Sequence, residues 1–311
     1  MDTEAHIIRS FDWRDFADGP AWETWRAAKI RTSQWMNGQP PVRLDSLSHC
    51  SPGVRAELKR RCALVNFATY QADTPDRTAK AASAALGDFA RSLGLTLAED
   101  HRSADELGIV ALQTSSPPSK KGYIPYTARP LNWHTDGYYN DGSEPVQAFI
   151  LHCHQQAASG GENQLLDPEL AYLHLRQIDP RLVGALMHPR AMTIPENREP
   201  DGTPRPASVG PVFFADRRSK RLQMRYTART RSIEWRDDPD TIRATGLLSD
   251  WLASGDPMIA SVRLRPGQGI VNNNVLHNRT GFADASGAEG ARVMLRARFH
   301  ERLAEDQLGA A

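Results

Sequence analysis

Two histidines and one aspartate are the candidate metal ligands of this chain of 311 residues. His134 and Asp136 are separated by one residue, so on an extended backbone their side chains leave the same face. His277 lies far downstream, after a Pro-Gly turn and a predicted strand. Two imidazoles and a carboxylate form the facial triad typical of non-heme Fe(II) oxygenases, which leaves coordination positions open for other ligands. The pattern therefore predicts a catalytic iron site at His134, Asp136 and His277.

A cationic strand near the end of the chain is the second chemical signal. In residues 291–299, strict alternation places Arg292, Arg296 and Arg298 on one face and apolar side chains on the other. If the apolar face packs against helices, the arginines point inward, where a guanidinium needs an anionic partner. Its planar fork matches a carboxylate with two parallel hydrogen bonds. A small dicarboxylate is the partner that this strand predicts.

Each pattern also has a purely structural explanation. A histidine two residues before a carboxylate arises by chance about once in a chain of this composition, and His277 could be an ordinary turn histidine. The arginines could lie on an edge strand with solvated guanidinium groups. A distal histidine and an arginine face in the same chain favour the metal site over these explanations.

The first third of the chain is predicted to be mostly helical. Apolar spacing indicates helices at residues 20–36, 53–60 and 75–93. A short strand is expected at 42–44 and a β-rich run at 63–70.

After residue 105 the chain changes to short strands separated by Asp-Gly, Gly-Gly and Pro-Gly turns. We predict one domain over residues 1–311, in which residues 1–105 pack on a core at 106–300. The expected class is mainly β with flanking helices, with a double-stranded β-helix (jelly roll) core. The expected strands are 107–112, 146–154, 163–166, 211–215, 222–228, 258–264, 269–275 and 291–299, and the expected helices are 168–178, 181–188 and 240–252.

Composition excludes several classes of protein. Lys plus Arg number 38 and Asp plus Glu 37, so the cationic excess of a nucleic-acid binder is missing. No apolar run approaches the length of a membrane span, and the start has no signal-peptide pattern. Three cysteines without a CxxC pair favour a reducing compartment. We expect a cytoplasmic protein with a small-molecule substrate and neither a nucleic-acid nor a membrane partner; a homo-oligomer is compatible with the sequence.

The chain resembles the Fe(II)- and 2-oxoglutarate-dependent dioxygenases of the taurine dioxygenase (TauD/TfdA-like) superfamily. The resemblance covers about residues 106–300, and its motif style is closest to the glutarate hydroxylase and γ-butyrobetaine hydroxylase branches. It rests on four motifs in order: Asn132-Trp133-His134-Thr135-Asp136-Gly137, Gly160-Gly161-Glu162-Asn163, Asn272-Asn273-Asn274-Val275-Leu276-His277-Asn278-Arg279, and Arg292 with Arg296.

The resemblance implies roles for individual residues. It implies that His134, Asp136 and His277 bind iron. It also implies that Arg292 binds the distal carboxylate of 2-oxoglutarate. Arg296 would lie beside this cosubstrate or reach the substrate, and Asn163 would add a hydrogen bond to the same carboxylate. Because some branches use an Arg-x-Arg pair here, Arg296 with Arg298 is the alternative to Arg292.

The expected reaction couples the decarboxylation of 2-oxoglutarate by O2, which gives succinate and CO2, to hydroxylation of an unactivated C–H bond. The extra arginines favour an anionic or zwitterionic small molecule as substrate. Desaturation, cyclisation or dealkylation would use the same cofactors, and a jelly-roll metal hydrolase or a non-enzymatic binding module are alternatives of other classes. Candidate substrate contacts are Tyr138, Tyr139, Arg225 and Arg298, and the loops 115–122 and 196–210 are candidate lids.

Overall fold

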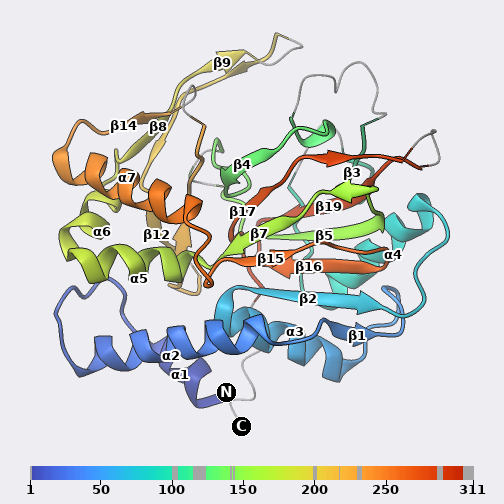
Figure 1. The fold of residues 1–311 in the computed structure, drawn as a ribbon, viewed down its shortest axis with the longest axis horizontal. Helices are drawn as coiled ribbons and strands as arrows, with labels where there is room; N and C mark the ends of the chain where they lie inside the picture. Colours follow the sequence, from blue (N-terminus) through green and yellow to red (C-terminus); the bar gives the residue numbers. More distant parts are fainter. Residues whose placement is uncertain are drawn as a thin grey trace.

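A computed structural model describes the fold of this chain at residues 2–99, 104–114, 124–140, 142, 144–198, 202–216, 218–229, 233–285 and 290–303. In Figure 1, most strands lie at the centre and right of the molecule, helices lie below them and to the left, and a few further strands lie above the helices on the left. The helices are α1 (Asp2–Ser10), α2 (Pro20–Asn37), α3 (Pro52–Val65), α4 (Ala79–Ser92), η2 (Ile124–Tyr126), α5 (Pro168–Ile178), α6 (Pro180–Leu186) and α7 (Pro239–Ala253). None of the helices within these ranges has the length and hydropathy needed to cross a bilayer.

The strands of the described residues are short, and ten of the nineteen belong to two sheets. They are β1 (Val42–Leu44), β2 (Phe67–Ala72), β3 (Ile109–Leu112), β4 (Leu131–His134), β5 (Ala148–Gln155), β6 (Ser159–Gly160), β7 (Asn163–Leu166), β8 (Met192–Ile194), β9 (Asn197–Arg198), β10 (Pro204–Arg205), β11 (Ser208–Gly210), β12 (Phe213–Ala215), β13 (Leu222–Met224), β14 (Glu234–Trp235), β15 (Ala260–Val262), β16 (Gln268–Asn272), β17 (Leu276–Arg279), β18 (Phe282–Ala283) and β19 (Val293–Phe299).

The larger sheet has six strands in the order β1-β2-β16-β5-β19-β3. The pair β1 and β2 is parallel, and the other neighbours are antiparallel. One face of this sheet buries Tyr70, Ile150 and Leu295 in a hydrophobic cluster with Leu58 of α3 and Phe89 of α4. The apolar face of β19 therefore packs against helices, as its alternation predicts.

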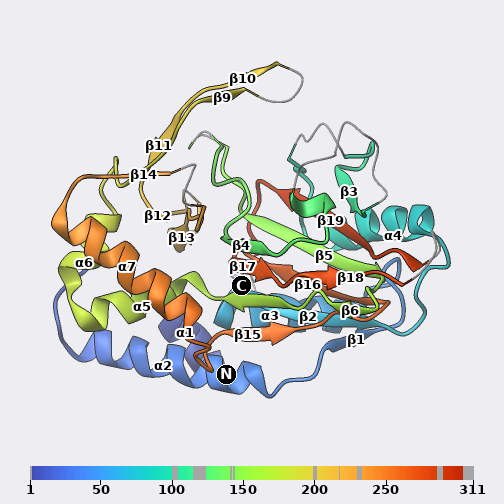
Figure 2. The same cartoon turned by 45° about the horizontal axis from the view of Figure 1, so that its top comes forward.

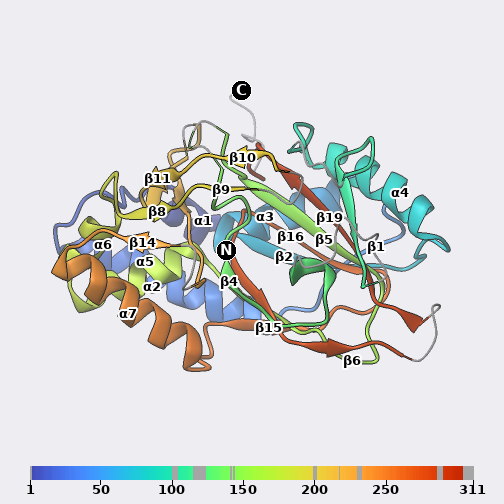
Figure 3. The same cartoon turned by 90° about the horizontal axis from the view of Figure 1, so that it is seen from above.

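The smaller sheet has four antiparallel strands in the order β15-β7-β17-β4. Figure 3 shows this sheet, marked by β4 and β15, alongside the larger one, marked by β5, β16 and β19. The rings of Phe149 on β5 and His277 on β17 lie 4.7 Å apart, centroid to centroid, so the two sheets meet at this point. The expectation of strands with flanking helices is confirmed in this form: mixed sheets and seven α-helices within the described ranges.

Helices α2, α5, α6 and α7 pack together beside the sheets. Trp22 and Trp25 of α2 contact the ring of Tyr172 on α5. Lys29 of α2 is fully buried and forms ion pairs with Asp167 and Glu169 at the start of α5. Because the Asp167 side chain also caps α5, this buried charge group fixes where the helix begins.

Several expected elements differ from the observed ones. The run 63–70 was expected to be β-rich, but α3 continues to residue 65, where Asn66 ends it with a left-handed φ of 64°. The described parts of the segment 196–210 contain β9, β10 and β11, which project from the body as a ribbon in Figure 2, where a loop was expected. Helix α1 and strands β4 and β17 were not predicted. The candidate lid 115–122 lies outside the described residues.

Candidate metal centre

Two adjacent strands bring the candidate histidines together. Strand β17 pairs with β4 in antiparallel register, and His277 is directly opposite His134. Asp136 follows two residues after β4 ends. Ligand atoms of these three residues lie within 4.8 Å of one another, and all three side chains are buried. The structure thus brings together the three side chains that the sequence singled out, and their role as metal ligands stays a prediction.

Both imidazole rings are oriented by their own strands. Nδ1 of His134 lies 2.8 Å from the carbonyl oxygen of Asn132, and Nδ1 of His277 lies 3.0 Å from that of Val275. A carbonyl only accepts hydrogen bonds, so each Nδ1 carries the proton and donates. Nε2 of each ring keeps its lone pair, which is the arrangement found in histidines that bind metals.

The turn after Asp136 needs glycine. Gly137 has a φ of +66°, and a Cβ there would lie 2.6 Å from Cγ2 of Val146. The chain reverses at this point, with the N–H of Asn140 donating to the carbonyl of Gly137. Asp136 can therefore follow a strand directly and still present its carboxylate to the histidines.

The inner face of β19 supplies positive charge to this centre. Nη1 of Arg296 lies 3.2 Å from Oδ1 of Asp136, and Nη1 of Arg298 lies 3.9 Å from the same atom. Nε of Arg298 also lies 2.5 Å from Oε2 of Glu99. Burial alone would raise the pKa of Asp136, but Arg296 and Arg298 outweigh it and hold this pKa well below its usual range. The carboxylate is therefore ionised at neutral pH.

Arg292 occupies a different place from the other two arginines. It precedes β19 and lines a small cavity together with Asn163, Gly161 and Met294. Its guanidinium stacks on Phe282 at 5.0 Å, and among the described residues no carboxylate lies at ion-pair distance from it. Nδ2 of Asn163 is buried and has no hydrogen-bond partner among these residues. An arginine without a carboxylate and an unused amide donor thus face one cavity.

A scan against family models matches residues 72–298 to the family described as taurine catabolism dioxygenase TauD, TfdA family. The chain belongs to the TauD/TfdA family. It is therefore an oxidoreductase, an iron- and 2-oxoglutarate-dependent oxygenase that uses O2. The branch within the family stays a prediction.

Solved structures similar to this TauD/TfdA chain share its fold at low sequence identity. OrfP, a non-heme iron oxygenase solved with Fe and α-ketoglutaric acid, has a TM-score of 0.55 at 14% identity over 98% of this chain and 93% of its own. PvcB from Pseudomonas aeruginosa has a TM-score of 0.54 at 15% identity over 88% of each chain. An asparagine oxygenase solved with Fe(II), a hydroxyasparagine and succinate has a TM-score of 0.53 at 15% identity over 96% of this chain and 92% of its own.

The tyrosines after the metal motif lie beside the centre. The ring of Tyr138 meets that of His134 edge to face, with 6.4 Å between centroids. The hydroxyl of Tyr139 accepts a hydrogen bond of 3.2 Å from Nη1 of Arg298. Both tyrosines are partly exposed. Tyr138 thus lies beside His134, and Tyr139 lies beside Arg298.

Arg225 is held by the backbone. Its guanidinium donates to the carbonyls of Tyr138, Met192 and Ser208 at 2.7, 3.1 and 2.8 Å. Burial lowers its pKa to about 10. These bonds connect β8 and β11 to the turn after Asp136. They occupy the guanidinium that was expected to contact substrate.

Sequence reasoning missed two residues at the centre, Glu99 and Asn274. Glu99 comes from the first third of the chain, where no pattern marked a chemical role. Asn274 stands in the motif that contains His277, but an asparagine before a strand is ordinarily a turn residue. Both are buried and contact the centre through side-chain hydrogen bonds or ion pairs.

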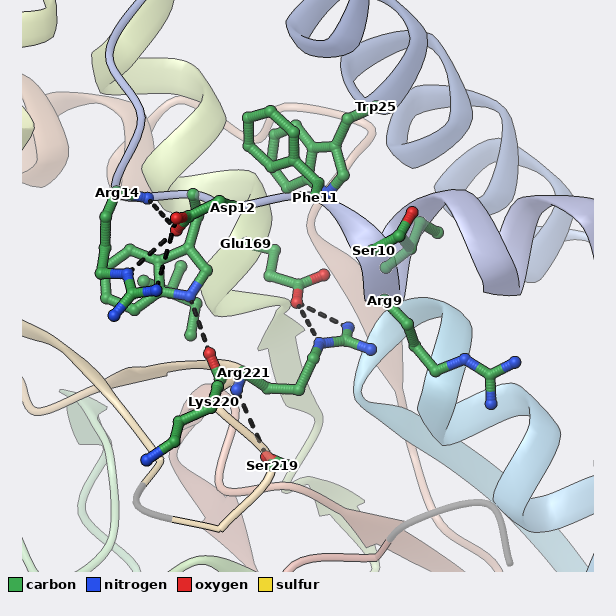
Figure 4. Close-up of a pocket in the computed structure, with 13 residues that line it drawn as sticks. Arg9, Ser10, Phe11, Asp12, Arg14, Trp25, Glu169, Ser219, Lys220 and Arg221 are labelled. Atoms are coloured by element: carbon green, nitrogen blue, oxygen red, sulfur yellow. Dashed lines mark hydrogen bonds and ion pairs between the residues drawn. The ribbon is translucent and has the colours of Figure 1, made fainter. Parts of the chain in front are cut away.

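A separate cavity of about 180 Å³ lies between the loop after α1 and the turn before β13 (Figure 4). Its lining shares no residue with the metal centre. Arg14 pairs there with Asp12, and Arg221 pairs with Glu169. Since these two guanidinium groups already have carboxylate partners within the chain, neither is available to mark an anion site.

The histidines predict how stability depends on pH. Burial, followed by the neighbouring His277, lowers the pKa of His134 to about 3, and burial lowers that of His277 and, to about 4, that of His152. In the unfolded chain these groups titrate near 6.5. Below that pH the unfolded chain binds protons that the folded chain does not, so the unfolding free energy falls as pH drops from about 6.5 toward 4.

Each histidine held neutral contributes a slope of about 1.4 kcal/mol per pH unit in this window. Urea unfolding of chelator-treated protein at a series of pH values between 7.5 and 4.5 measures it. His152→Gln is expected to reduce the slope, because burial lowers the pKa of His152 to about 4. An unfolding free energy that stays flat over this range would contradict the prediction.

Proposed function

We propose that this enzyme hydroxylates a C–H bond of a small anionic or zwitterionic molecule, and that His134, Asp136 and His277 hold its iron. The observation that carries the proposal is the close approach of their ligand atoms, within 4.8 Å, beside a strand of inward-facing arginines. An iron site explains the neutral imidazoles, and a keto-diacid cosubstrate explains the arginines.

The residues present fit an Fe(II) ion. Oδ2 of Asp136 is buried and has no hydrogen-bond partner among the described residues, which is costly unless a cation or donor reaches it. Both Nε2 atoms are unprotonated, and two imidazoles with one carboxylate suit Fe(II). When bound, the iron and 2-oxoglutarate supply the oxidation of the substrate by O2, with succinate and CO2 as products. The protein orients these groups and limits the access of water.

We assign the distal carboxylate of 2-oxoglutarate to Arg292 and Asn163. Of the three arginines that the sequence left open, Arg296 and Arg298 already have the carboxylates of Asp136 and Glu99 as partners. Arg292 has none among the described residues, and it shares a cavity with the unused amide of Asn163. A carboxylate in this cavity would pair with both, which supports Arg292 over the alternative pair.

The arginines beside Asp136 favour a substrate with a negative group. Arg296 and Arg298 both approach Oδ1 of Asp136, and Nε of Arg296 is buried with no hydrogen-bond partner among the described residues. A buried guanidinium with an unused donor favours an anionic partner. Arg296 and Arg298 are the proposed contacts, with Tyr138 and Tyr139 beside them.

The proposed architecture of the core is a jelly roll. Leaving out β1 and β2, the strand orders are β16-β5-β19-β3 and β15-β7-β17-β4. Eight antiparallel strands in two facing sheets are typical of this fold.

A single domain is supported by hydrophobic clusters that mix residues from both sides of position 105. A cytoplasmic location is supported by three cysteines that are buried and unpaired.

Two measurements test the proposal. Anaerobic addition of Fe(II) and 2-oxoglutarate is expected to give a weak metal-to-ligand charge-transfer band in the visible, and folded protein without this band contradicts the iron and cosubstrate assignment.

A screen of succinate release with amino acids, betaines, dicarboxylates and sulfonates then identifies the substrate. A product that has gained one oxygen atom indicates hydroxylation, and one that has lost two hydrogens indicates desaturation. Succinate release that is independent of oxygen would contradict an oxygenase.

A further inference from the structure

Three consecutive asparagines precede the strand that carries His277, and their side chains bind three different parts of the molecule. Asn272 donates to the carbonyl of Phe149 on β5 at 3.0 Å. Asn273 accepts from the N–H of Leu303 near the C-terminus at 2.9 Å. Asn274 reaches the backbone of the metal motif. All three asparagines are at least 97% buried, so these contacts are internal.

Asn274 holds both backbone polar groups of Asp136. Its Oδ1 accepts from the N–H of Asp136 at 2.8 Å, and its Nδ2 donates to the carbonyl of Asp136 at 2.9 Å. Nδ2 also donates to the carbonyl of Val146 at 2.8 Å. Both amide hydrogens are therefore used, and the side chain acts on Asp136 as a neighbouring strand would.

This clamp lies where the sheet no longer holds the chain. Strand β4 ends at His134, and beyond it the N–H of Thr135 bonds to the carbonyl of Tyr226. Asp136 is the next residue, and its N–H and carbonyl are the groups that Asn274 takes. Without Asn274, two buried backbone groups beside the carboxylate would lose their partners.

The position of Asn274 in the chain couples the clamp to the second histidine. It lies three residues before His277, and its φ of 51° is in the left-handed region. Asparagine adopts this region more readily than most residues other than glycine. One residue thus provides the bend that leads into β17 and an amide that reaches Asp136.

We propose that Asn274 is a positioning residue that fixes the carboxylate of Asp136 relative to His277 and thereby sets the affinity of the site for its metal. The inference rests on the proposed iron site. Groups that hold a metal ligand in place typically change metal affinity about 10- to 100-fold when they are removed.

The test compares Asn274→Asp with Asn273→Asp. Both changes keep the size of a buried side chain in the same turn, but only the first replaces donors that face the carbonyls of Asp136 and Val146 with a carboxylate oxygen. The measurements are the dissociation constant for Mn(II) and the urea midpoint of the chelator-treated protein. We expect Asn274→Asp to weaken Mn(II) binding about 10- to 100-fold, and Asn273→Asp to bind Mn(II) as the parent does.

Asn274→Gly is the second variant, because it keeps the left-handed backbone and removes the amide. Weakened Mn(II) binding in this variant supports the proposal. If both Asn274 variants bind Mn(II) as tightly as the parent, or if neither folds, Asn274 serves the fold alone and the proposal is overturned. A parent protein that binds no Mn(II) contradicts the iron site itself, whereas a parent that binds it together with unaffected Asn274 variants contradicts only this inference.

Discussion

His134→Ala and Asp136→Ala are expected to abolish turnover, with a loss well beyond the roughly 10- to 100-fold that removal of a supporting group costs at a metal site. Each change removes one of three proposed metal ligands whose atoms lie within 4.8 Å, and no other His, Cys, Asp or Glu of the described residues completes a second such group. Succinate release and bound iron, measured on the same preparations, are both expected to fall to background.

The two variants are expected to differ in stability. The pKa of His134 is lowered to about 3 by burial and by His277, so the imidazole is neutral at pH 7. Its replacement by alanine therefore leaves no buried charge without a partner. Removal of the Asp136 carboxylate leaves Arg296 and Arg298 with an unbalanced buried charge, and breaking a buried pair in this way costs about 3 to 5 kcal/mol. The chelator-treated Asp136 variant should therefore unfold at lower urea than the His134 variant.

Asn132→Ala is the matched control, because Asn132 is on the same strand, is exposed, and holds His134 only through its backbone carbonyl. It is expected to keep iron and turnover. Normal turnover in His134→Ala would remove the iron assignment, and equal urea midpoints for the two ligand variants would contradict the charge argument.

The candidate metal ligands could be singled out in the sequence because each belongs to a local pattern. The side chains of His134 and Asp136 do approach each other, although Asp136 lies in the turn beyond β4 and not on extended backbone. Alternation along β19 placed Arg296 and Arg298 on the buried face, where the structure has them. The patterns could not predict which residues of β4 and β17 pair with each other. The pairing of His134 with His277 depends on β4 and β17, two strands of four residues each, too short and too polar to show a period of two.

The remaining parts of the site depend on long-range contacts. Glu99 reaches Arg298 from the segment after α4, and Asn274 acts on Asp136 across 138 residues of chain. Neither contact leaves a periodic trace, because a single side chain makes it. The segment 196–210 was expected to be a loop for a similar reason: its glycines and prolines are turn signals, but its strands pair only over two or three residues. Where strands pair over so few residues, the amino-acid composition of the segment predicts a loop, and no alternation is long enough to indicate the strands.

Arg292→Ala is expected to raise the requirement for 2-oxoglutarate strongly, by about 2 to 5 kcal/mol of lost charge-pair binding. Among the described residues no carboxylate lies within ion-pair distance of the Arg292 guanidinium, and burial lowers its pKa more than Cys153 and Asp284 raise it, so an anion in its cavity would relieve a cost that the folded protein otherwise carries. The change should therefore stabilise or leave unchanged the protein without cosubstrate, while the concentration of 2-oxoglutarate needed for half-maximal succinate release rises.

Arg263→Ala distinguishes this effect from a general loss of positive charge. Arg263 lines the same cavity, but it is exposed and its guanidinium donates to the carbonyls of Ala157 and Ala158, so its removal should change the 2-oxoglutarate requirement little. Arg298→Ala is expected to act differently again, because it leaves Glu99 unpaired and should destabilise the fold. If Arg296→Ala or Arg298→Ala raises the 2-oxoglutarate requirement and Arg292→Ala does not, the assignment to Arg292 is wrong. The cosubstrate then binds further along β19, beside Arg296 and Arg298.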